Sequence, residues 1–363
     1  MMTEVTKRSD VMSTQRLTLR LILSLCAALF HAPAWAQNDL ERALLDGHAA
    51  GNLPGLHAVY VMREDDVLAE VYFEGTDQVW GAPIGNRQHG PDTLHDLRSV
   101  TKSVVGLLYG IALKDGLVPP PEAPLLVQFP EYVDLSSPER DAITIADVLT
   151  MRMGNAWDET LPYSDPRNSE IGMENAPDRI RFVLEQEMIA PPGEVFNYSG
   201  GTTALLAELI TRGSGQPLDV FARERLFDPL GIPRYEWVRG ADGRASAASG
   251  LRLSARSMAR IGEVILNDGM FNDTQIIPAD WLAAALSPHA SPDPLRYGFH
   301  WWLSPAGGPE WAAALGNGGQ RVSISKNLGL VVVIYAGNYN EPNAWEVPVS
   351  VIAQYIAPSL DLD

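Results

Sequence analysis

The sequence predicts an α+β protein in which one antiparallel sheet is built from both ends of the chain. Strand-like runs occupy residues 56–73, and they return after residue 296. Helical periodicities joined by proline-rich connections fill the stretch from about 117 to 288. Short turns between alternating apolar runs favour antiparallel pairing. We therefore expect a sheet flanked by helices, with an all-helical domain inserted between its two halves.

The N-terminal part predicts two strands, at 56–62 and 67–73, and the four polar residues between them are a hairpin signal. A short amphipathic helix at 41–48 is expected to pack on the outside of this part. Residues 75–90 are rich in glycine and polar side chains, which predicts a loop. That loop leads into a helix that begins at Ser99.

The remaining elements follow in two blocks. Five helices are expected in the inserted part, at 144–151, 177–187, 202–211, 253–267 and 278–286. Four strands and a closing helix follow, at 297–303, 311–315, 320–326, 328–335 and 344–356. The late strands most simply join the early pair, which leaves a cleft between the sheet and the helices. The predicted organisation is an α/β domain made of 37–116 and 291–363, with a helical domain at 117–290.

The first 36 residues are similar to a signal peptide. Arg16 and Arg20 precede an apolar run of ten residues, and Ala34-Trp35-Ala36 has the small residues of a cleavage site. The apolar run is too short to span a bilayer. We expect export to the periplasm or beyond, with no stable membrane insertion once the signal is removed. The one cysteine, Cys26, lies in this run, so the mature chain would have no disulfide and no thiol nucleophile.

Composition limits the partners. The formal net charge is -18, and it becomes -20 without the first 36 residues, which carry four basic and two acidic side chains. A charge of this sign repels nucleic acid and anionic membranes. No local group of histidine, cysteine or acidic residues has metal-ligand spacing, and no glycine-rich loop has the phosphate-binding order, so we expect no metal and no cofactor. The oligomeric state stays open.

Ser99 and Lys102 form the candidate catalytic pair. They stand at positions i and i+3 of the predicted helix, so both side chains lie on one face. A serine hydroxyl needs such a neighbour to act as a nucleophile, and a helix N-terminus favours a nearby oxyanion. A second Ser-x-x-Lys, at 323–326, lies in a predicted strand, where the two side chains would face opposite sides. The motif alone is equally compatible with a plain helix cap.

Two more motifs follow the Ser99-Val100-Thr101-Lys102 motif in a fixed order. They are Tyr198-Ser199-Gly200 and Gly316-Asn317-Gly318-Gly319-Gln320. Together the three motifs resemble the serine β-lactamase and penicillin-binding protein superfamily, in its class C-like branch of esterases and 6-aminohexanoate-dimer hydrolases. The likeness covers nearly all of the chain after residue 36, and it implies a β-lactamase/transpeptidase-like fold.

The resemblance also implies roles for individual residues. Ser99 would be the acylated nucleophile, Lys102 its neighbour one turn on, and Tyr198 the proton shuttle. The backbone amides of Ser99 and Gln320 would form the oxyanion hole. A tyrosine serves as a base only if cations lower its pKa, and Lys102 is the available cation. The alternative for Tyr198 is a buried phenol that packs the loop.

Two departures from the family pattern concern the substrate. Gly200 stands where β-lactam-active members usually have asparagine, and Asn317 stands where they have lysine. The groups that hold the acylamino and carboxylate parts of a β-lactam are therefore missing. Arg321 is close enough in sequence to replace the lysine. Substrate contacts are expected from Asn317, Gly318 and Gly319, and an apolar acyl pocket from Trp157 and Trp301, with Trp302; weaker candidates for the pocket are His95, Asp96 and His300.

The predicted function is an exported serine hydrolase that cleaves a small-molecule ester or amide through an acyl-enzyme. Cleavage of small esters or of ω-amino amides, as in the 6-aminohexanoate-dimer hydrolases, ranks above β-lactam hydrolysis because of the two departures. A β-lactamase or D,D-peptidase is the alternative within the same class. A non-catalytic protein that binds penicillin or peptidoglycan is the alternative from another class.

Overall fold

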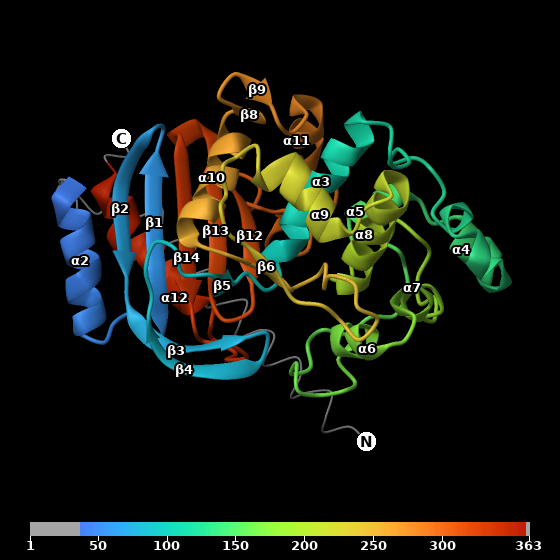
Figure 1. Ribbon diagram of the computed structural model, residues 1–363, viewed down its shortest axis with the longest axis horizontal. Coiled ribbons are helices and arrows are strands. Elements are labelled where there is room, and N and C mark those ends of the chain that lie inside the picture. The colour runs from blue at the N-terminus through green and yellow to red at the C-terminus, as the bar shows by residue number, and fades with distance from the viewer. Residues whose placement is uncertain (1–36, 361–363) are drawn as a thin grey trace.

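Apolar runs from the two ends of the chain form one antiparallel sheet (Figure 1). The structure is a computed structural model that describes residues 37–360, so the predicted signal peptide lies outside the described residues. The strands in spatial order are β10 (Arg296–Tyr297), β11 (Trp302–Leu303), β12 (Ala312–Gly316), β13 (Gln320–Ser325), β14 (Leu330–Ala336), β1 (Leu56–Arg63) and β2 (Asp66–Tyr72). Strand β14 pairs with β1 from Leu56↔Ala336 to Arg63↔Leu330, which confirms that both ends build one sheet.

Strand β14 lies inside the sheet, between β13 and β1, and all seven of its residues are buried. Alternate side chains of a strand point to opposite faces, so this strand contributes to two cores. Val331 and Val333 belong to the inner core, which continues into the helical part of the molecule, while Val332 and Ile334 belong to a smaller outer core. A strand buried on both faces reads as a continuous apolar run, as residues 330–336 do.

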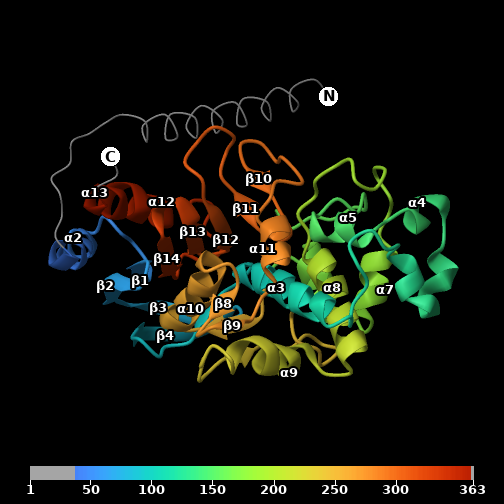
Figure 2. The same cartoon turned by 90° about the horizontal axis from the view of Figure 1, so that it is seen from above.

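Helices cover both faces of the sheet. The outer face carries α2 (Gln37–Ala49), α12 (Glu346–Ser350) and the helical turn η5 (Val351–Ile356), and the inner face carries α10 (Ala255–Leu266). Figure 2 shows α12 and α10 on opposite sides of the strands. The segment of α10 was predicted to belong to the helical domain, but it packs against β14 and β13 because its apolar face matches the inner face of the sheet.

The helical part packs against α3 (Val100–Lys114), which contacts β12 on one side and α8 (Gly200–Ser214) on the other. Its other helices are α4 (Pro138–Asp141), α5 (Ile145–Leu149), α6 (Ser169–Asn175), α7 (Arg179–Leu184), α9 (Leu218–Ala222) and α11 (Ala279–Ala285). Short polar side chains begin several of them. Thr144 forms a capping box with Asp147 at α5, and Asn168 caps α6.

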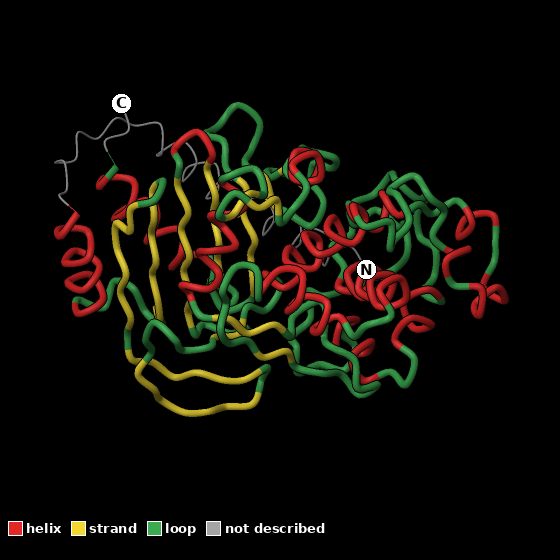
Figure 3. The backbone as a smooth tube through the Cα atoms, turned by 45° about the horizontal axis from the view of Figure 1, so that its top comes forward, coloured by secondary structure: helices red, strands yellow, loops and turns green. Residues whose placement is uncertain are grey.

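The predicted loop 75–90 is instead a hairpin of β3 (Glu74–Val79) and β4 (Ala82–Gln88), which Figure 3 shows beside the main sheet. Its two-residue turn has a positive φ at both Trp80 and Gly81, as hairpin turns of this length require. Every residue of β4 is exposed, so the strand lacks the apolar alternation that identifies a strand in a sequence.

Short strands join the sheet region to the helical part. A small sheet has the order β5 (His95–Asp96), β7 (Leu251–Leu253) and β6 (Glu236–Trp237), and β8 (Met270–Phe271) pairs with β9 (Thr274–Gln275). The predicted strand 297–303 is two short strands, β10 and β11, joined by a turn. Gly298 in this turn packs so closely on the carbonyl of Ala285 that a Cβ would lie 1.9 Å from its oxygen.

Candidate active site

Ser99 occupies the N-cap position of α3 but makes no capping hydrogen bond with its side chain, and only 8% of its surface is exposed. The residue before it, Arg98, has φ +50°, so the chain turns sharply into the helix. Gly316 at the end of β12 packs on this turn, where a Cβ would lie 2.4 Å from the Leu97 oxygen. The third sequence motif, which starts at Gly316, is therefore brought next to the nucleophile.

Lys102 is buried one turn into α3, with its ammonium directed at Ser99. Its Nζ lies 3.0 Å from Ser99 Oγ and 3.3 Å from both Glu170 Oε2 and the Ala248 carbonyl oxygen. Glu159 Oε2 is 3.5 Å away. Burial alone lowers the pKa of Lys102, but Glu159 and Glu170 outweigh it and hold the pKa well above its ordinary value. Lys102 is therefore a permanent cation that donates to Ser99 Oγ.

Glu159 and Glu170 are site residues that the sequence did not point to. Glu159 Oε1 accepts from Trp157 Nε1 at 2.7 Å and from the Gly200 amide, while its Oε2 has no hydrogen-bond partner and faces Lys102. Burial, reinforced by Glu170, raises the pKa of Glu159 to about 7 in spite of Lys102. Glu159 lies in a loop and Glu170 in the short helix α6, and neither belongs to a recognised motif. The only signal in the sequence was that they follow Trp157 and Asn168, respectively, by two residues.

Tyr198 lies beside Ser99 and Lys102, and a side-chain hydrogen bond with Ser99 is one of the effects that lower its pKa. The ring lies 5.0 Å from Lys102 Nζ and stacks on Trp302, with 5.6 Å between ring centres. Burial raises the pKa of Tyr198, and the opposing effect of Lys102 does not cancel it. The expected lowering of this pKa was wrong, because burial, reinforced by Glu159 and Glu170, outweighs the charge of Lys102. Tyr198 is a neutral phenol at rest.

Gly200, which replaces the asparagine of β-lactam-active members, has a packing explanation. A Cβ at this position would lie 2.9 Å from Ala248 Cβ, 3.0 Å from Glu159 Oε1 and 3.2 Å from Glu170 Oε2. The two carboxylates that pair with Lys102 occupy the space that a side chain would need. The backbone amide of Gly200 is in turn held by Glu159.

The third motif forms the turn into β13. Gly318 and Gly319 have φ of +92° and +93°, a conformation that favours glycine. The side chain of Asn317 accepts from the Asn340 amide at 3.0 Å, and that of Gln320 donates to the Ala336 oxygen at 2.6 Å. Both side chains therefore hold the turn. The oxyanion hole formed by the backbone amides of Ser99 and Gln320 stays a prediction.

Arg321 does not replace the missing lysine. It pairs across strands with Ile334, a residue of the outer core, so its side chain is on the sheet face opposite α3. There its Nε donates to Ser323 Oγ at 2.8 Å and its guanidinium lies 5.1 Å from the centre of the Trp311 ring.

The tryptophan predictions need correction. Trp301 is fully buried in the inner core, so it has no surface for a substrate. Its neighbour Trp302, the first residue of β11, is partly exposed and stacks on Tyr198. Trp157 orients Glu159 through its indole N–H, and an edge-on contact with Phe182 fixes its ring.

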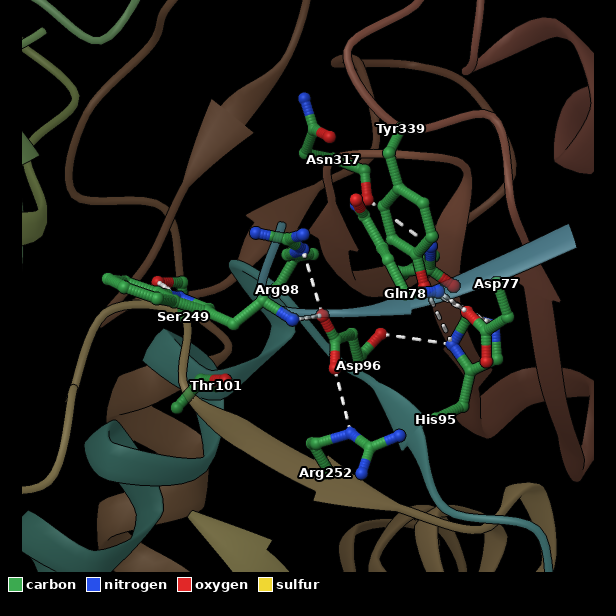
Figure 4. A network of polar contacts seen from close by, with 12 residues as sticks. Asp77, Gln78, His95, Asp96, Arg98, Thr101, Ser249, Arg252, Asn317 and Tyr339 are labelled. Atoms are coloured by element: carbon green, nitrogen blue, oxygen red, sulfur yellow. Dashed lines mark hydrogen bonds and ion pairs between the residues drawn. The ribbon is translucent and has the colours of Figure 1, made fainter. Parts of the chain in front are cut away.

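His300 and the pair His95–Asp96 are also placed away from a substrate pocket. His300 is buried, with Nδ1 3.0 Å from the Leu149 oxygen and Nε2 3.0 Å from Thr203 Oγ1. Burial lowers the pKa of His300 to about 4, so it is a neutral packing residue. Arg252 Nε donates to Asp96 Oδ1 at 2.8 Å, as Figure 4 shows.

The comparisons with known proteins agree with this geometry. The sequence profile of the beta-lactamase family matches residues 39–345. The chain belongs to the beta-lactamase family. A curated relative, the 6-aminohexanoate-dimer hydrolase of Paenarthrobacter ureafaciens, is 25% identical over 243 residues, which are 63% of this chain and 57% of that protein. The chain thus matches less than two thirds of that relative's length.

Solved structures of the family have the same fold. A protein from Bacillus anthracis that carries the provisional name of a 6-aminohexanoate-dimer hydrolase has a TM-score of 0.69 and 22% identity, with 87% of this chain and 82% of that chain covered. The hydrolase EstCE1, described as having promiscuous acyltransferase activity, has a TM-score of 0.67 and 14% identity over 88% of this chain and 97% of that chain. These likenesses confirm the predicted β-lactamase/transpeptidase-like fold. Within residues 37–360, no helix is long and apolar enough to cross a membrane.

Proposed function

We propose that the protein is an exported serine hydrolase that cleaves small-molecule esters or amides through an acyl-enzyme on Ser99. The observation that carries this proposal is the contact of Lys102 Nζ with Ser99 Oγ at 3.0 Å, beside the ring of Tyr198, whose centre lies 5.0 Å from the same Nζ. A nucleophile beside a cation and a proton carrier is an arrangement used in covalent catalysis. The named activities of the relatives, 6-aminohexanoate-dimer hydrolase and promiscuous acyltransferase, support the same class.

Acylation begins with attack of Ser99 Oγ on the substrate carbonyl carbon. The hydroxyl proton passes to the Tyr198 oxygen, and the phenol proton passes to the leaving alkoxide or amine. A neutral tyrosine suffices for this exchange, because it gains one proton as it loses another. Lys102 stabilises the developing alkoxide by charge, and the amides of Ser99 and Gln320 hold the oxyanion. In deacylation, water gives a proton to Tyr198, which returns its own proton to Ser99 Oγ.

The charges around Ser99 favour an acyl group that is neutral or carries an amine over one that carries a carboxylate. Glu159 and Glu170 face a single lysine, and the third motif provides asparagine where a lysine would grip a β-lactam carboxylate. Arg321 is on the other face of the sheet. We therefore rank small esters and ω-amino amides of the 6-aminohexanoate-dimer type first. β-Lactamase or D,D-peptidase activity is the second candidate in this class, because the family match supports it.

The test is hydrolysis of p-nitrophenyl butyrate, nitrocefin and the 6-aminohexanoate dimer by the mature chain. We expect turnover of the ester or the dimer, little turnover of nitrocefin, and no turnover by Ser99→Ala. Ser323→Ala is the matched control, because it removes the serine of the second Ser-x-x-Lys, which lies in β13. Equal activity of wild type and Ser99→Ala contradicts the proposal, and rapid nitrocefin turnover reverses the ranking of substrates.

The binding-protein alternative and the export step have tests of their own. A stable adduct of penicillin on Ser99 in intact-mass spectra, with no hydrolysis of any substrate, favours a non-catalytic binding protein. Export rests on the signal-like pattern of residues 1–36. We expect the full chain to be recovered from the periplasm or medium with Gln37 as its N-terminal residue. Recovery of the uncleaved chain from the cytoplasm contradicts export.

A further inference from the structure

A buried cluster of three histidines and one aspartate lies behind the nucleophile and has no part in the proposed mechanism. His57 belongs to β1, Asp77 to β3 and His95 to β5, and His89 follows β4. All four are buried, and one nitrogen or carboxylate oxygen of each lies within 4.8 Å of the others. Figure 4 shows Asp77 and His95 facing each other there. We call these four residues the His3Asp cluster.

Hydrogen bonds to backbone carbonyls determine which imidazole nitrogens carry protons. His89 Nδ1 lies 2.8 Å from the Phe73 oxygen, and His95 Nδ1 lies 3.1 Å from the Asp96 oxygen. A carbonyl oxygen only accepts, so both Nδ1 atoms are N–H donors. In the neutral imidazole, the Nε2 of His89 and of His95 is then a bare lone pair.

These lone pairs face other acceptors. His89 Nε2 is 3.4 Å from Asp77 Oδ2, and His95 Nε2 is 3.8 Å from Asp77 Oδ1 and 2.9 Å from His57 Nδ1. Tyr339 donates its hydroxyl to Asp77 Oδ1 at 3.1 Å. Acceptors that converge in a buried space need a cation between them.

Protons satisfy this cluster only in part. If His57 Nδ1 donates to His95 Nε2, the His57 Nε2 atom becomes a buried acceptor, and that atom has no hydrogen-bond partner. His89 Nε2 still faces a carboxylate unless the ring carries a second proton. The competing arrangement is therefore a buried imidazolium–carboxylate pair. It holds an extra proton, whereas a metal site holds a metal ion.

We propose that the His3Asp cluster binds one divalent transition-metal ion, with Zn²⁺ as the expected ion. Three imidazoles and one carboxylate make a four-ligand set that suits zinc. With bonds of about 2.0–2.1 Å, neighbouring donors of a tetrahedral zinc lie about 3.4 Å apart, and the separations of 2.9, 3.4 and 3.8 Å bracket this value. The Nδ1–H bonds of His89 and His95 to carbonyls are the outer contacts that orient ligating histidines.

The site would be structural, and it would position the nucleophile. His95 starts the five-residue segment that ends at Ser99. Asp96, next along, binds both Arg98, at 3.3 Å, and Arg252, at 2.8 Å. The Arg98 guanidinium in turn lies 5.0 Å from the centre of the Tyr339 ring. The hydroxyl of Tyr339 donates to Asp77, a member of the cluster (Figure 4). A metal here would tie β1, the β3–β4 hairpin and this segment together in a chain whose one cysteine, Cys26, precedes the described residues.

We expected no metal from the sequence, because successive ligands stand 20, 12 and 6 residues apart in different strands and loops, which leaves no spacing signature. Only Asp77, His89 and His95 lie within one short stretch, and the hairpin that folds them together was itself not predicted. The proposal does not depend on the proposed hydrolase activity.

The experiment is direct metal binding by the mature wild-type protein after treatment with a chelator and desalting. When Zn²⁺ is added back, we expect elemental analysis to find one equivalent per chain and the melting temperature to rise. When Co²⁺ is added instead, we expect the visible absorption of tetrahedral Co²⁺. His89→Ala and Asp77→Asn should each weaken Zn²⁺ binding at least tenfold. His289→Ala, which changes a partly buried histidine stacked on Phe299, should leave binding unchanged.

Two outcomes overturn the proposal. Wild-type protein that takes up no Zn²⁺ or Co²⁺ and shows no change in melting temperature leaves the cluster as a proton-linked ion pair. Equal binding by wild type, His89→Ala and Asp77→Asn assigns the metal to another part of the chain. The wild-type titration decides the question even if a cluster variant fails to fold.

Discussion

Lys102 illustrates how neighbours decide the role of a catalytic residue. Its ammonium is surrounded by Ser99, two glutamates and a backbone carbonyl, and its pKa is held well above normal. A lysine that stays charged cannot accept the Ser99 proton, so the proposed mechanism gives that step to Tyr198. Because burial raises the pKa of Tyr198, the tyrosine would work as a neutral proton carrier.

Tyr198→Phe tests this division of labour. The substitution keeps the ring that stacks on Trp302 and removes only the oxygen that contacts Ser99. We expect kcat for ester hydrolysis to fall about 100- to 10,000-fold with little change in KM, which is the usual effect of a lost acid–base group. Tyr235→Phe, on a partly buried tyrosine that contacts the Asp219 oxygen, should retain full activity. An unchanged kcat in Tyr198→Phe assigns proton transfer to another group.

Glu159 predicts a pH dependence. Its raised pKa, about 7, means that the carboxylate form dominates above pH 7 and the neutral acid below it. A proton on Oε2 would face the Lys102 ammonium, which has no lone pair to accept it. We therefore expect kcat/KM to fall as pH drops through about 7, by distortion of the Lys102 contact.

The Glu159→Gln variant mimics the neutral acid at every pH. It should show low activity and no step near pH 7 in a profile from pH 5.5 to 8.5. Glu263→Gln is the control, since burial also raises the pKa of this glutamate but it lies on α10. A step near pH 7 that survives in Glu159→Gln belongs to a different group.

At the scale of elements, the start of α8 shows why a motif position changed. Gly200 and Gly201 begin the helix where it meets Glu159, Trp157 and Ala248, and a Cβ at Gly200 would approach three atoms at 2.9–3.2 Å. The ion pairs of Lys102 with the two glutamates therefore need a glycine at position 200. An asparagine there would press against both carboxylates.

Gly200→Asn tests that dependence. We expect the variant to lose about 1–3 kcal/mol of unfolding free energy through overpacking, to lose esterase activity, and to gain no nitrocefin turnover. Thermal melting and the two hydrolysis assays measure this. Gly90→Ala is a suitable control, because its nearest neighbour to a new Cβ is 3.9 Å away. Efficient nitrocefin hydrolysis by Gly200→Asn contradicts the account of the substrate given above.

At the scale of the whole molecule, the sheet separates the inner core from the outer core, and the two cores pack different elements. The inner core packs the helices that carry the site, while the outer core joins the first helix, α2, to η5 near the end of the described chain. The helix α2 meets Tyr355 so closely that a Cβ at Gly47 would lie 2.3 Å from its hydroxyl oxygen. Stability and catalysis are therefore partly separable.

Two neighbouring leucines of α2 test this separation. Leu44 is fully buried in the outer core, whereas Leu45 is 48% exposed. Leu44→Ala should lower the unfolding free energy by about 2–5 kcal/mol in urea titrations, with kcat at 25 °C unchanged. Leu45→Ala should cost less than about 0.5 kcal/mol. Equal losses in the two variants, or a lower kcat in folded Leu44→Ala, would show that the outer core is coupled to the site.

The sequence by itself determined the fold class and the family, and it predicted the three candidate catalytic residues. Local patterns carry this information: an i, i+3 pair, a helix start, and apolar runs whose period reports strand or helix. The elements that pack on the inner or outer core, such as β1, α3 and β14, were predicted close to their observed bounds. Their burial imposes the periodicity that a sequence displays.

Only the tertiary structure decided which other side chains meet these residues. Glu159 and Glu170 reach Lys102 from 57 and 68 positions away along the chain, and the His3Asp cluster is assembled from separate strands. Such contacts leave no periodic trace, because each partner is a single residue in its own element. The exposed strand β4 was missed, and Trp301 was predicted at the site where Trp302 lies, for the same reason. Burial depends on the whole folded chain, so a local sequence pattern does not show which side chains of these segments are buried.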